Sequence, residues 1–398
     1  MPKQSAASAA GLPVVKVSPR GATRLKDGHV WVYRSDVAAN AVPPGALVSV
    51  ADERGKVLGT ALYSNSSQIA IRMISRDVVP DLSSLLRERI QAAIAYRERV
   101  VRDTDAYRLV FSEADFLPGL IVDRYNDLLS LQVLTQAMDA EPVRQTIVSE
   151  LNERLQPAAI AERVDPRVRE LEQLPPRSSG LIHGEKNSTV FSMNGVKFQY
   201  DALQGQKTGA FLDQRENYAA AAQYARGEAL DVFCYQGGFA LHLAPRCSAV
   251  TGVDSSRPAL EMAEQNAALN GREIEWIEGN AFDLLKDYAT SGRQYDTIVL
   301  DPPAFAKGKR NLETALRGYK ELNLRALKML RPGGVLVTCS CSYHVSLADF
   351  LAMLASAAND AHRTLRVLEV RGQARDHPIM LNVPETGYLK AAIVNVNN

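Results

Sequence analysis

Cysteine and long apolar stretches are both scarce in this sequence of 398 residues. Four cysteines in so long a chain do not form a disulfide framework, which favours the reducing cytoplasm. No run of about 18 apolar residues occurs, so we expect no membrane-spanning helix. The opening MPKQSAASAAGLP lacks the apolar core of a signal peptide and is typical of a loose tail. We therefore expect a soluble, cytoplasmic protein.

The net charge of +1 conceals an uneven distribution along the chain. Residues 1–80 contain ten Lys/Arg and five Asp/Glu, whereas the rest of the chain contains 36 and 40. A small basic domain on a nearly neutral body suits a polyanion such as RNA. Ordinary variation of surface charge explains the same numbers equally well.

The length exceeds that of one ordinary hydrophobic core and predicts two or three domains. Residues 14–76 hold five short strand-like stretches separated by turn residues, which predicts a small β-barrel. A helix is expected over 81–103, with Asp81 or Ser83 as its cap, and a second over 141–155.

The second half of the chain has a different pattern. The polar segment 156–188 is either a linker or a strand pair, and a hairpin with Asn194 and Gly195 at its turn follows. From about residue 203, apolar strands alternate with helices, which predicts an α/β domain with a parallel sheet. Ligands of such sheets bind at the carboxyl ends of the strands.

Polar residues follow several of these strands. Gly237 and Gly238 form a turn after the first strand, and Asp254 closes the second, about 20 residues after a glycine turn as in nucleotide-binding folds. Asn280 follows the third strand and Asp301 the fourth. An acidic side chain placed like Asp254 can accept hydrogen bonds from ribose hydroxyls, so we expect a nucleotide-like cofactor here; the rival interpretation is a plain strand-to-helix turn.

The sequence lacks both common phosphate-binding signatures. YQGGFA has no third glycine and is not G-x-G-x-x-G, and no G-x-x-x-x-G-K-[ST] is present. An adenosine without a pyrophosphate therefore fits better than NAD or ATP, and hydride transfer becomes a distant alternative. The arrangement resembles class I S-adenosylmethionine methyltransferases. The cofactor contacts that this resemblance implies are Phe233, Tyr235, Gly237, Gly238, Asp254, Ser255, Asn280, Ala281, Phe282, Asp301, Gln214 and Arg215.

Cys339 and Cys341 lie two apart in VTCSCSYHV, at the end of a predicted strand. Zinc needs three or four ligands, and only His344 is near, so a metal site is disfavoured. Two cysteines on the same face of one strand have poor geometry for a disulfide. Packing and nucleophilic catalysis remain as the two interpretations.

Methylation of a pyrimidine at C5 gives a chemical reason for a thiol. That carbon is too weak a nucleophile until a thiolate adds to C6 and forms a covalent adduct. Asp301 is the candidate acid that stabilises the developing charge near N3 or the exocyclic amine. The alternative is methylation of an exocyclic nitrogen by the LDPPAF loop, but Ala304 stands where such enzymes usually have an aromatic, and Phe305 comes one residue later.

Several stretches together resemble one bacterial family, the 23S (large-subunit) ribosomal RNA cytosine-C5 methyltransferases with an N-terminal PUA domain. The resemblance implies a small β-barrel PUA domain over 12–78, a middle α+β domain over 79–188, and over 189–398 a Rossmann-like methyltransferase domain with a mostly parallel seven-stranded sheet. The stretches that carry it are RGATRLKDGHVWVYRSDV (20–37), GQKTGAFLDQREN (205–217), CYQGGFALHLA (234–244), LDPPAFAK (300–307), SCS (340–342) and DHPIMLNVPETGYLK (376–390).

The resemblance bears on which cysteine reacts. The cysteine of this family lies in Ser-Cys-Ser, which maps to Cys341, whereas the broader RNA cytosine-C5 class uses Thr-Cys-Ser, which maps to Cys339. We favour Cys341. The broader class has a second cysteine after its aspartate-proline loop, and DPPAF has none, so the release of the adduct stays open.

Ribosomal RNA is the expected partner, and its contacts are predicted on three parts of the chain. The stretch 205–217 is either a lid whose Gln214 and Arg215 contact cofactor or RNA, or a turn before a helix. Phe305 and Tyr343 are placed to hold an unstacked base, with core packing as the equal rival. The cations expected to contact RNA, or else to form solvated surface, are Arg20, Arg24, Lys26, Lys307, Lys309 and Arg310.

Two functional alternatives remain beside cytosine-C5 methylation: N-methylation of an RNA base, and a non-catalytic RNA-binding assembly factor that kept the fold. No metal is expected. A homodimer stays open, because nothing in the sequence determines the oligomeric state.

Overall fold

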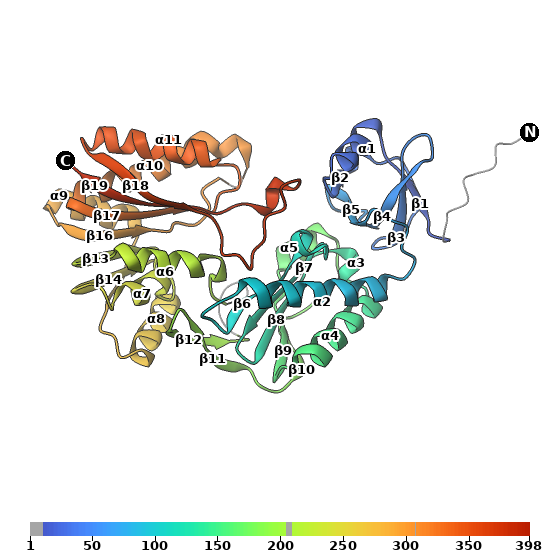
Figure 1. The fold of residues 1–398 in the computed structure, drawn as a ribbon, viewed down its shortest axis with the longest axis horizontal. Helices are drawn as coiled ribbons and strands as arrows, with labels where there is room; N and C mark the ends of the chain where they lie inside the picture. The colour runs from blue at the N-terminus through green and yellow to red at the C-terminus, as the bar shows by residue number, and fades with distance from the viewer. Residues whose placement is uncertain (1–10, 204–208, 307) are drawn as a thin grey trace, which may run out of the picture. The chain divides into compact units, whose positions relative to one another are not determined.

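A computed structural model describes residues 11–203, 209–306 and 308–398 (Figure 1). The chain divides into two compact units that are not contiguous in sequence. Unit 1 comprises Met1–Thr189, Tyr200–Gly209 and Arg375–Thr386, and unit 2 comprises Val190–Gln199, Ala210–Ala374 and Gly387–Asn398.

Unit 1 begins with the expected small β domain. Its five strands are β1 (Val14–Lys16), β2 (Trp31–Tyr33), β3 (Leu47–Ala51), β4 (Val57–Tyr63) and β5 (Ile69–Ser75). They pair in the order β1-β3-β4-β5-β2, and a bridge between Val17 and Val37 joins the two edges into a barrel-like closure. Buried valines from these strands, with Ile71 and Met73 of β5, fill the interior.

The sequence interpretation did not anticipate helix α1 (Pro19–Lys26) in this domain. Ser18 caps the helix by accepting a hydrogen bond from the Gly21 amide at 3.2 Å, and a proline occupies the first turn. The short 3₁₀ turn η1 (Arg34–Asp36) follows β2.

The rest of unit 1 is an α+β layer (Figure 1). Its sheet has the order β10-β9-β8-β7-β6, and α2 packs beside α4. The segment 156–188 is thus the strand-pair alternative, because β9 and β10 pair antiparallel. The elements are α2 (Leu82–Val100), β6 (Ala106–Phe111), η2 (Ser112–Asp115), β7 (Leu120–Tyr125), β8 (Leu128–Val133), α3 (Gln136–Asp139), α4 (Glu141–Leu155), β9 (Ala159–Glu162), α5 (Pro166–Leu171) and β10 (Gly180–Gly184).

Asp81 caps α2, as one of the two predicted caps, by accepting from the Ser84 amide at 3.1 Å. A segment from near the C-terminus, Arg375–Thr386 with its 3₁₀ turn η5 (Pro384–Thr386), also belongs to unit 1. The Arg97 side chain on α2 is 1% exposed and donates to the Asp376 carbonyl at 2.8 Å. This buried contact fixes the segment against the middle layer.

Unit 2 contains most of a hairpin and the large sheet. The hairpin strands are β11 (Ser188–Met193) and β12 (Val196–Asp201), and Asn194 and Gly195 adopt positive φ at the turn, as predicted. The strands of the large sheet are β13 (Glu228–Val232), β14 (Ala249–Asp254), β15 (Glu275–Glu278), β16 (Tyr295–Leu300), β17 (Leu330–Ser340), β18 (Thr364–Arg371) and β19 (Lys390–Asn397).

This sheet has the order β15-β14-β13-β16-β17-β19-β18, and only β19 runs antiparallel to its neighbours. Helices α9, α10 and α11 cover one face, and α6, α7 and α8 cover the other (Figure 1). The helices and turns are η3 (Leu212–Gln214), α6 (Arg215–Tyr224), α7 (Gly238–Leu243), α8 (Arg257–Leu269), α9 (Ala281–Ser291), η4 (Lys309–Asn311), α10 (Leu312–Met329) and α11 (Leu347–Asp360).

The predicted α/β class with its mostly parallel seven-stranded sheet is confirmed, and so is the small β domain before it. Burial of the apolar central strands between two helical layers explains the near-continuous apolar runs in β13, β16 and β17. None of the helices in the described ranges is long and apolar enough to cross a membrane.

Candidate active site

The carboxyl ends of neighbouring parallel strands bring the predicted chemistry together. Strand β13 lies between β14 and β16, and β17 pairs with the other side of β16. Asp254 ends β14, Asp301 directly follows β16, and Cys339 is the penultimate residue of β17. Because Leu300 pairs with Thr338, Asp301 and Cys339 leave adjacent strands at the same level.

The turn after β13 has an unusual backbone. Phe233, Tyr235 and Gly237 all adopt positive φ, at 68°, 50° and 83°. Such conformations are uncommon for residues other than glycine, and they cluster at functional sites. The turn is held in place because the Tyr235 amide donates to Asp254 Oδ2 at 2.9 Å.

The two glycines of this turn are required by the protein's own packing. A Cβ on Gly237 would lie 2.8 Å from the Trp276 ring, and one on Gly238 would lie 2.5 Å from the Tyr218 hydroxyl. The positive φ of Gly237 adds a conformational requirement. A close approach of the backbone to a ligand, the reason that the sequence suggested, stays a prediction beside these two causes.

Asp254 is suited to bind ribose hydroxyls. Its Oδ1 accepts from the Ser256 amide and its Oδ2 from the Tyr235 amide, each at 2.9 Å. An ionised carboxylate offers about four acceptor positions, so two remain for a ligand. Ser255 is exposed beside it.

Residues 280–282 form the start of α9. The Asn280 side chain caps the helix by accepting from the Phe282 amide at 2.9 Å. Asn280 is exposed, Ala281 is buried, and Phe282 is half-buried against the core. The ends of β14 and β15 thus offer an anchored carboxylate, an exposed polar cap and an apolar surface, as the sequence predicted for an adenosine group.

Gln214 and Arg215 are both buried, at 3% and 1% exposure. The Gln214 amide donates to Asp301 Oδ2 at 3.0 Å and accepts from the Asn217 amide at 2.6 Å. The Arg215 guanidinium lies 3.7 Å from the Glu216 carboxylate. Gln214 thus contacts the predicted catalytic aspartate, whereas Arg215 lies in the protein interior. The stretch before them, 204–208, lies outside the described residues.

The two cysteines of the SCS region have different environments. Cys339 is fully buried, and burial with the Asp301 charge raises the pKa of its thiol well above the ordinary value. Cys341 is half-buried after the end of β17, and its thiol donates to the Pro302 carbonyl at 3.9 Å. A thiolate is the reactive form of a cysteine, and the burial of Cys339 opposes its formation there.

All four cysteines are free thiols. Across residues 11–203, 209–306 and 308–398, no cluster of three or more His, Cys, Asp or Glu side chains is arranged to hold a metal ion.

Ser342 joins the cysteine loop to the aspartate-proline loop. Its hydroxyl accepts from the Ala306 amide at 3.1 Å and lies 2.9 Å from the Tyr319 hydroxyl. Together with the contact between Cys341 and Pro302, this link fixes the thiol beside the loop that begins at Asp301.

The two predicted base-holding aromatics have different positions. Phe305 packs against Tyr319 and Phe282, with ring centroids 4.7 and 6.0 Å away, so packing occupies much of its surface. Tyr343 is 43% exposed and contacts the ring of His344 edge-on. Tyr343 is the aromatic with surface left for a base.

Comparison with known proteins agrees with this geometry. Residues 15–76 match a PUA-like domain family, and residues 128–392 match the S-adenosylmethionine-dependent methyltransferase family. The ribosomal RNA large subunit methyltransferase I of Shewanella denitrificans is 38% identical, over 96% of this chain and 99% of that protein. The protein of the same name from Tolumonas auensis is 40% identical, over 92% and 95%. The chain belongs to the ribosomal RNA large subunit methyltransferase I family.

The cofactor of this methyltransferase is therefore S-adenosylmethionine, as predicted. The solved structure of a methyltransferase complexed with SAH is 19% identical to it, with a TM-score of 0.82 over 96% of this chain and all of that chain. A SAM-dependent methyltransferase from Streptococcus mutans matches to the same extent. At this identity the likeness shows a shared fold.

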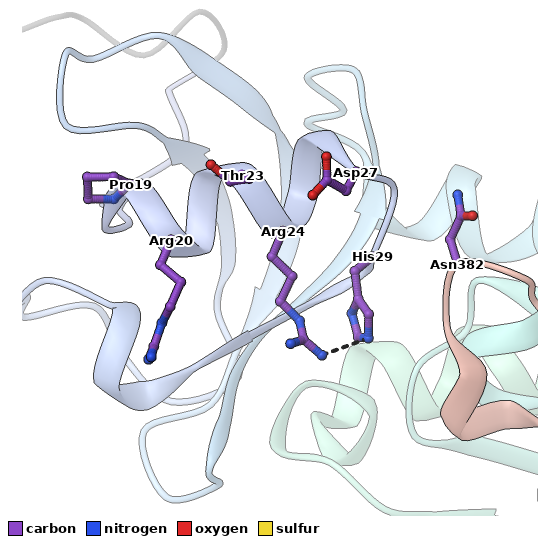
Figure 2. A pocket seen from close by; sticks show the side chains of 7 residues that line it. All are labelled: Pro19, Arg20, Thr23, Arg24, Asp27, His29 and Asn382. Atoms are coloured by element: carbon purple, nitrogen blue, oxygen red, sulfur yellow. Dashed lines mark hydrogen bonds between the residues drawn. The ribbon is translucent and has the colours of Figure 1, made fainter. Parts of the chain in front are cut away.

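Arg20 and Arg24, two of the three RNA contacts predicted in the methyltransferase's first domain, line a hollow of about 580 Å³ in unit 1 (Figure 2). Arg20 points from α1 and forms a two-pronged contact with Asp36, with its nitrogens 2.8–3.0 Å from the carboxylate oxygens. Arg24 lies 2.8 Å from His29 Nε2 and 3.6 Å from Glu385. Both cations therefore already have partners.

A second, more basic cleft in unit 1 was not predicted. It has a volume of about 640 Å³, and one acidic residue, Asp77, lines it. Phe116 at its edge is 38% exposed, and the Arg89 guanidinium lies 5.0 Å from the centre of its ring. Its cations come from four separate stretches of sequence, which hides the cluster in a linear reading; they are Lys26, Lys56, Arg76 and Arg89.

The KGKRN stretch near the catalytic loop is described in part. Lys307 lies outside the described residues, the backbone of Lys309 begins η4, and Arg310 is exposed. Arg310 thus lies in η4, two residues before α10, and its contact with RNA phosphate stays a prediction.

Proposed function

We propose that the protein methylates C5 of a cytosine in large-subunit ribosomal RNA, with Cys341 as the nucleophile. The substrate class rests on the name that its close relatives share. The observation that carries the mechanism is the contrast between a fully buried Cys339 and a half-buried Cys341 next to the Asp301 loop.

The chain's own residues supply the activation of the base. The Cys341 thiolate adds to C6 of the cytosine, which makes C5 nucleophilic. Asp301, which accepts from the Gln214 amide, is proposed to act in its protonated form, as the acid that donates a hydrogen bond near N3 or the exocyclic amine and so stabilises the negative charge that the thiolate brings to the ring. Bound S-adenosylmethionine supplies an electrophilic methyl group. After loss of the C5 proton, the Cys341 sulfur leaves C6 and the aromatic ring is restored.

Residues 233–238, with Asp254 and Ser255, are proposed to hold the amino-acid and ribose parts of the cofactor. Residues 280–282 are proposed to lie near its adenine. The strained turn and the free acceptor positions of Asp254 support this assignment.

We assign RNA binding chiefly to residues 12–78, joined by the middle layer of residues 79–188, and catalysis to residues 189–398. The unpredicted basic cleft supports a backbone-binding role, because its cations greatly exceed its acids. Since bacterial ribosomal RNA is cytoplasmic, this activity places the protein in the cytoplasm.

The test is incubation of the full chain with large-subunit RNA that lacks this modification and with labelled cofactor, followed by nucleoside mass spectrometry. The proposal predicts label in 5-methylcytidine at one position. Label on an exocyclic nitrogen would instead support the aspartate-proline loop acting alone. Cofactor binding without any transfer would support a non-catalytic assembly factor.

A further inference from the structure

Lys390 is a buried cation close to the proposed nucleophile. It begins β19, where it pairs with Ser340 at the end of β17, one residue before Cys341. Its side chain is largely buried, with the residue only 8% exposed. The ammonium donates to the Ser342 carbonyl at 2.6 Å and to the Tyr388 carbonyl at 2.7 Å.

The burial of this charge needs an explanation. An ammonium withdrawn from water is costly unless it is paired, and buried lysines normally have a carboxylate partner. Among the described residues, Lys390 has no carboxylate within ion-pair distance, and two carbonyl oxygens are its hydrogen-bond acceptors. Packing alone would be served better by an apolar side chain of the same length.

Groups from four elements of the described chain interact with Cys341. Cys339 lies on β17, Tyr319 on α10, Lys390 on β19, and the Pro302 carbonyl follows Asp301 at the end of β16. In this set, drawn from the described residues, Lys390 alone is a cation. A cysteine next to a cation is more readily ionised, whereas burial and acidic neighbours have the opposite effect.

We infer that the Lys390 ammonium holds the Cys341 loop and stabilises the thiolate of Cys341. This inference rests on the proposed role of Cys341 and makes Lys390 a positioning residue for it. The two carbonyl contacts place the ammonium on the strand that flanks the nucleophile, and its charge complements the sulfur after the thiol has lost its proton.

The electrostatics of the pair agree with this geometry. Burial lowers the pKa of Lys390 to about 8, while a thiolate at Cys341 raises it. The interaction is reciprocal, so a charged Lys390 favours the thiolate form of Cys341. Above pH of about 8, the ammonium loses its proton and this help fades.

Alkylation by iodoacetamide tests the inference without RNA, with the rate at each cysteine followed by peptide mass spectrometry from pH 5 to 10. Cys247 is the internal reference, because it is also half-buried and burial with Asp296 raises its pKa to about 11. The wild-type protein should show Cys341 reacting with a midpoint well below that of Cys247. Two variants separate charge from hydrogen bonding: Lys390→Gln keeps donors for the carbonyls, and Lys390→Arg keeps the charge.

Lys390→Gln should raise the Cys341 midpoint by about one pH unit and slow its alkylation near pH 7 about tenfold. Lys390→Arg should retain the wild-type midpoint, and Cys247 should be unaffected in both. Coinciding Cys341 profiles for wild type and Lys390→Gln would overturn the inference. If Lys390→Gln does not fold, a wild-type Cys341 midpoint at or above that of an ordinary thiol overturns it equally. Methylation that survives Cys341→Ala would refute the proposed role of Cys341 in catalysis. It would not by itself refute the effect of Lys390 on the Cys341 thiol, because the alkylation profile is measured without methylation.

Discussion

At the residue scale, Cys339 and Cys341 of TCSCS show how burial separates two chemically identical groups. Cys339 lies inside the sheet, where desolvation and Asp301 oppose its ionisation. Cys341 lies one residue past the strand end, beside Pro302. Spacing in the sequence places both cysteines near the same strand end, and burial in the structure distinguishes them.

Gln214 provides a test at this scale, because its amide holds Asp301 at 3.0 Å. Gln214→Leu should lower kcat by up to about 10²-fold through misplacement of the aspartate, while the KM for RNA changes little. Gln223→Leu is a matched control at an exposed position of α6, the helix that begins directly after Gln214. Steady-state methylation kinetics measure both parameters. Equal kcat in the two variants would show that Gln214 does not position Asp301 for catalysis.

The sequence predicted Asp254, Asp301 and the cysteine pair, because each follows an apolar strand in a recognisable α/β order. It could not predict the role of Lys390, because that depends on the antiparallel register of β19 with β17. Gln214 was predicted as a contact of cofactor or RNA, and its hydrogen bond to Asp301 became visible only in three dimensions.

At the element scale, β13 and α7 are joined by a buried acid. Asp231 on β13 is fully buried and accepts from the Ala240 amide at 2.9 Å. Burial raises its pKa to about 8, and the charges of Asp301 and Asp254 add to this effect. The hydrogen bond from Ala240 acts in the opposite direction.

This raised pKa predicts a pH-dependent stability. The folded state retains the proton of Asp231 up to pH of about 8, whereas the unfolded chain loses it near pH 4. The stabilisation is therefore complete below about pH 4, and the free energy of unfolding declines by up to about 1.4 kcal/mol per pH unit until about pH 8. Asp231→Asn mimics the protonated side chain and should flatten this decline. Urea denaturation at four pH values gives the free energy of unfolding of wild type and Asp231→Asn. If that free energy declined with pH equally in the two proteins, the prediction would be refuted.

Local sequence patterns predicted some helices and strands of unit 1 but not others. The short apolar stretches of β3, β4 and β5, separated by turn residues, made these strands predictable, and Asp81 marked the start of α2. Helix α1 was missed because its eight residues are too few for a periodic pattern. It is stabilised from outside, because its cap Ser18 and its residue Arg20 both bind Asp36 at the end of η1.

At the scale of the whole molecule, the sequence conveyed the order of the domains but not the path of the chain between them. The segments Tyr200–Gly209 and Arg375–Thr386 belong to unit 1, although their flanking residues belong to unit 2. Arg97 and Asp376 are 279 residues apart in the sequence, and the Arg97 guanidinium donates a hydrogen bond to the Asp376 carbonyl. Local patterns do not encode such contacts.

The basic cleft leads to a prediction about RNA binding by the whole chain. Lys56→Ala and Arg76→Ala should each weaken binding, because both are exposed cations that line the cleft. Each should also reduce the slope of log affinity against log salt by about one, as expected for one lost phosphate contact. Arg102→Ala removes an exposed cation outside the cleft and is the control. Filter binding over a salt series gives the affinity and the slope. If Lys56→Ala and Arg76→Ala had the same slope as Arg102→Ala, the cleft would not be a phosphate-binding site.

The central claim is that Cys341 forms a covalent bond to C6 of a cytosine. Large-subunit RNA fragments that contain 5-fluorocytosine test it directly, because fluorine at C5 cannot leave as a proton and the adduct persists. Wild type and Cys339→Ala should give a complex that survives denaturing electrophoresis, and Cys341→Ala should give none. A complex that persists in Cys341→Ala and disappears in Cys339→Ala would contradict the assignment.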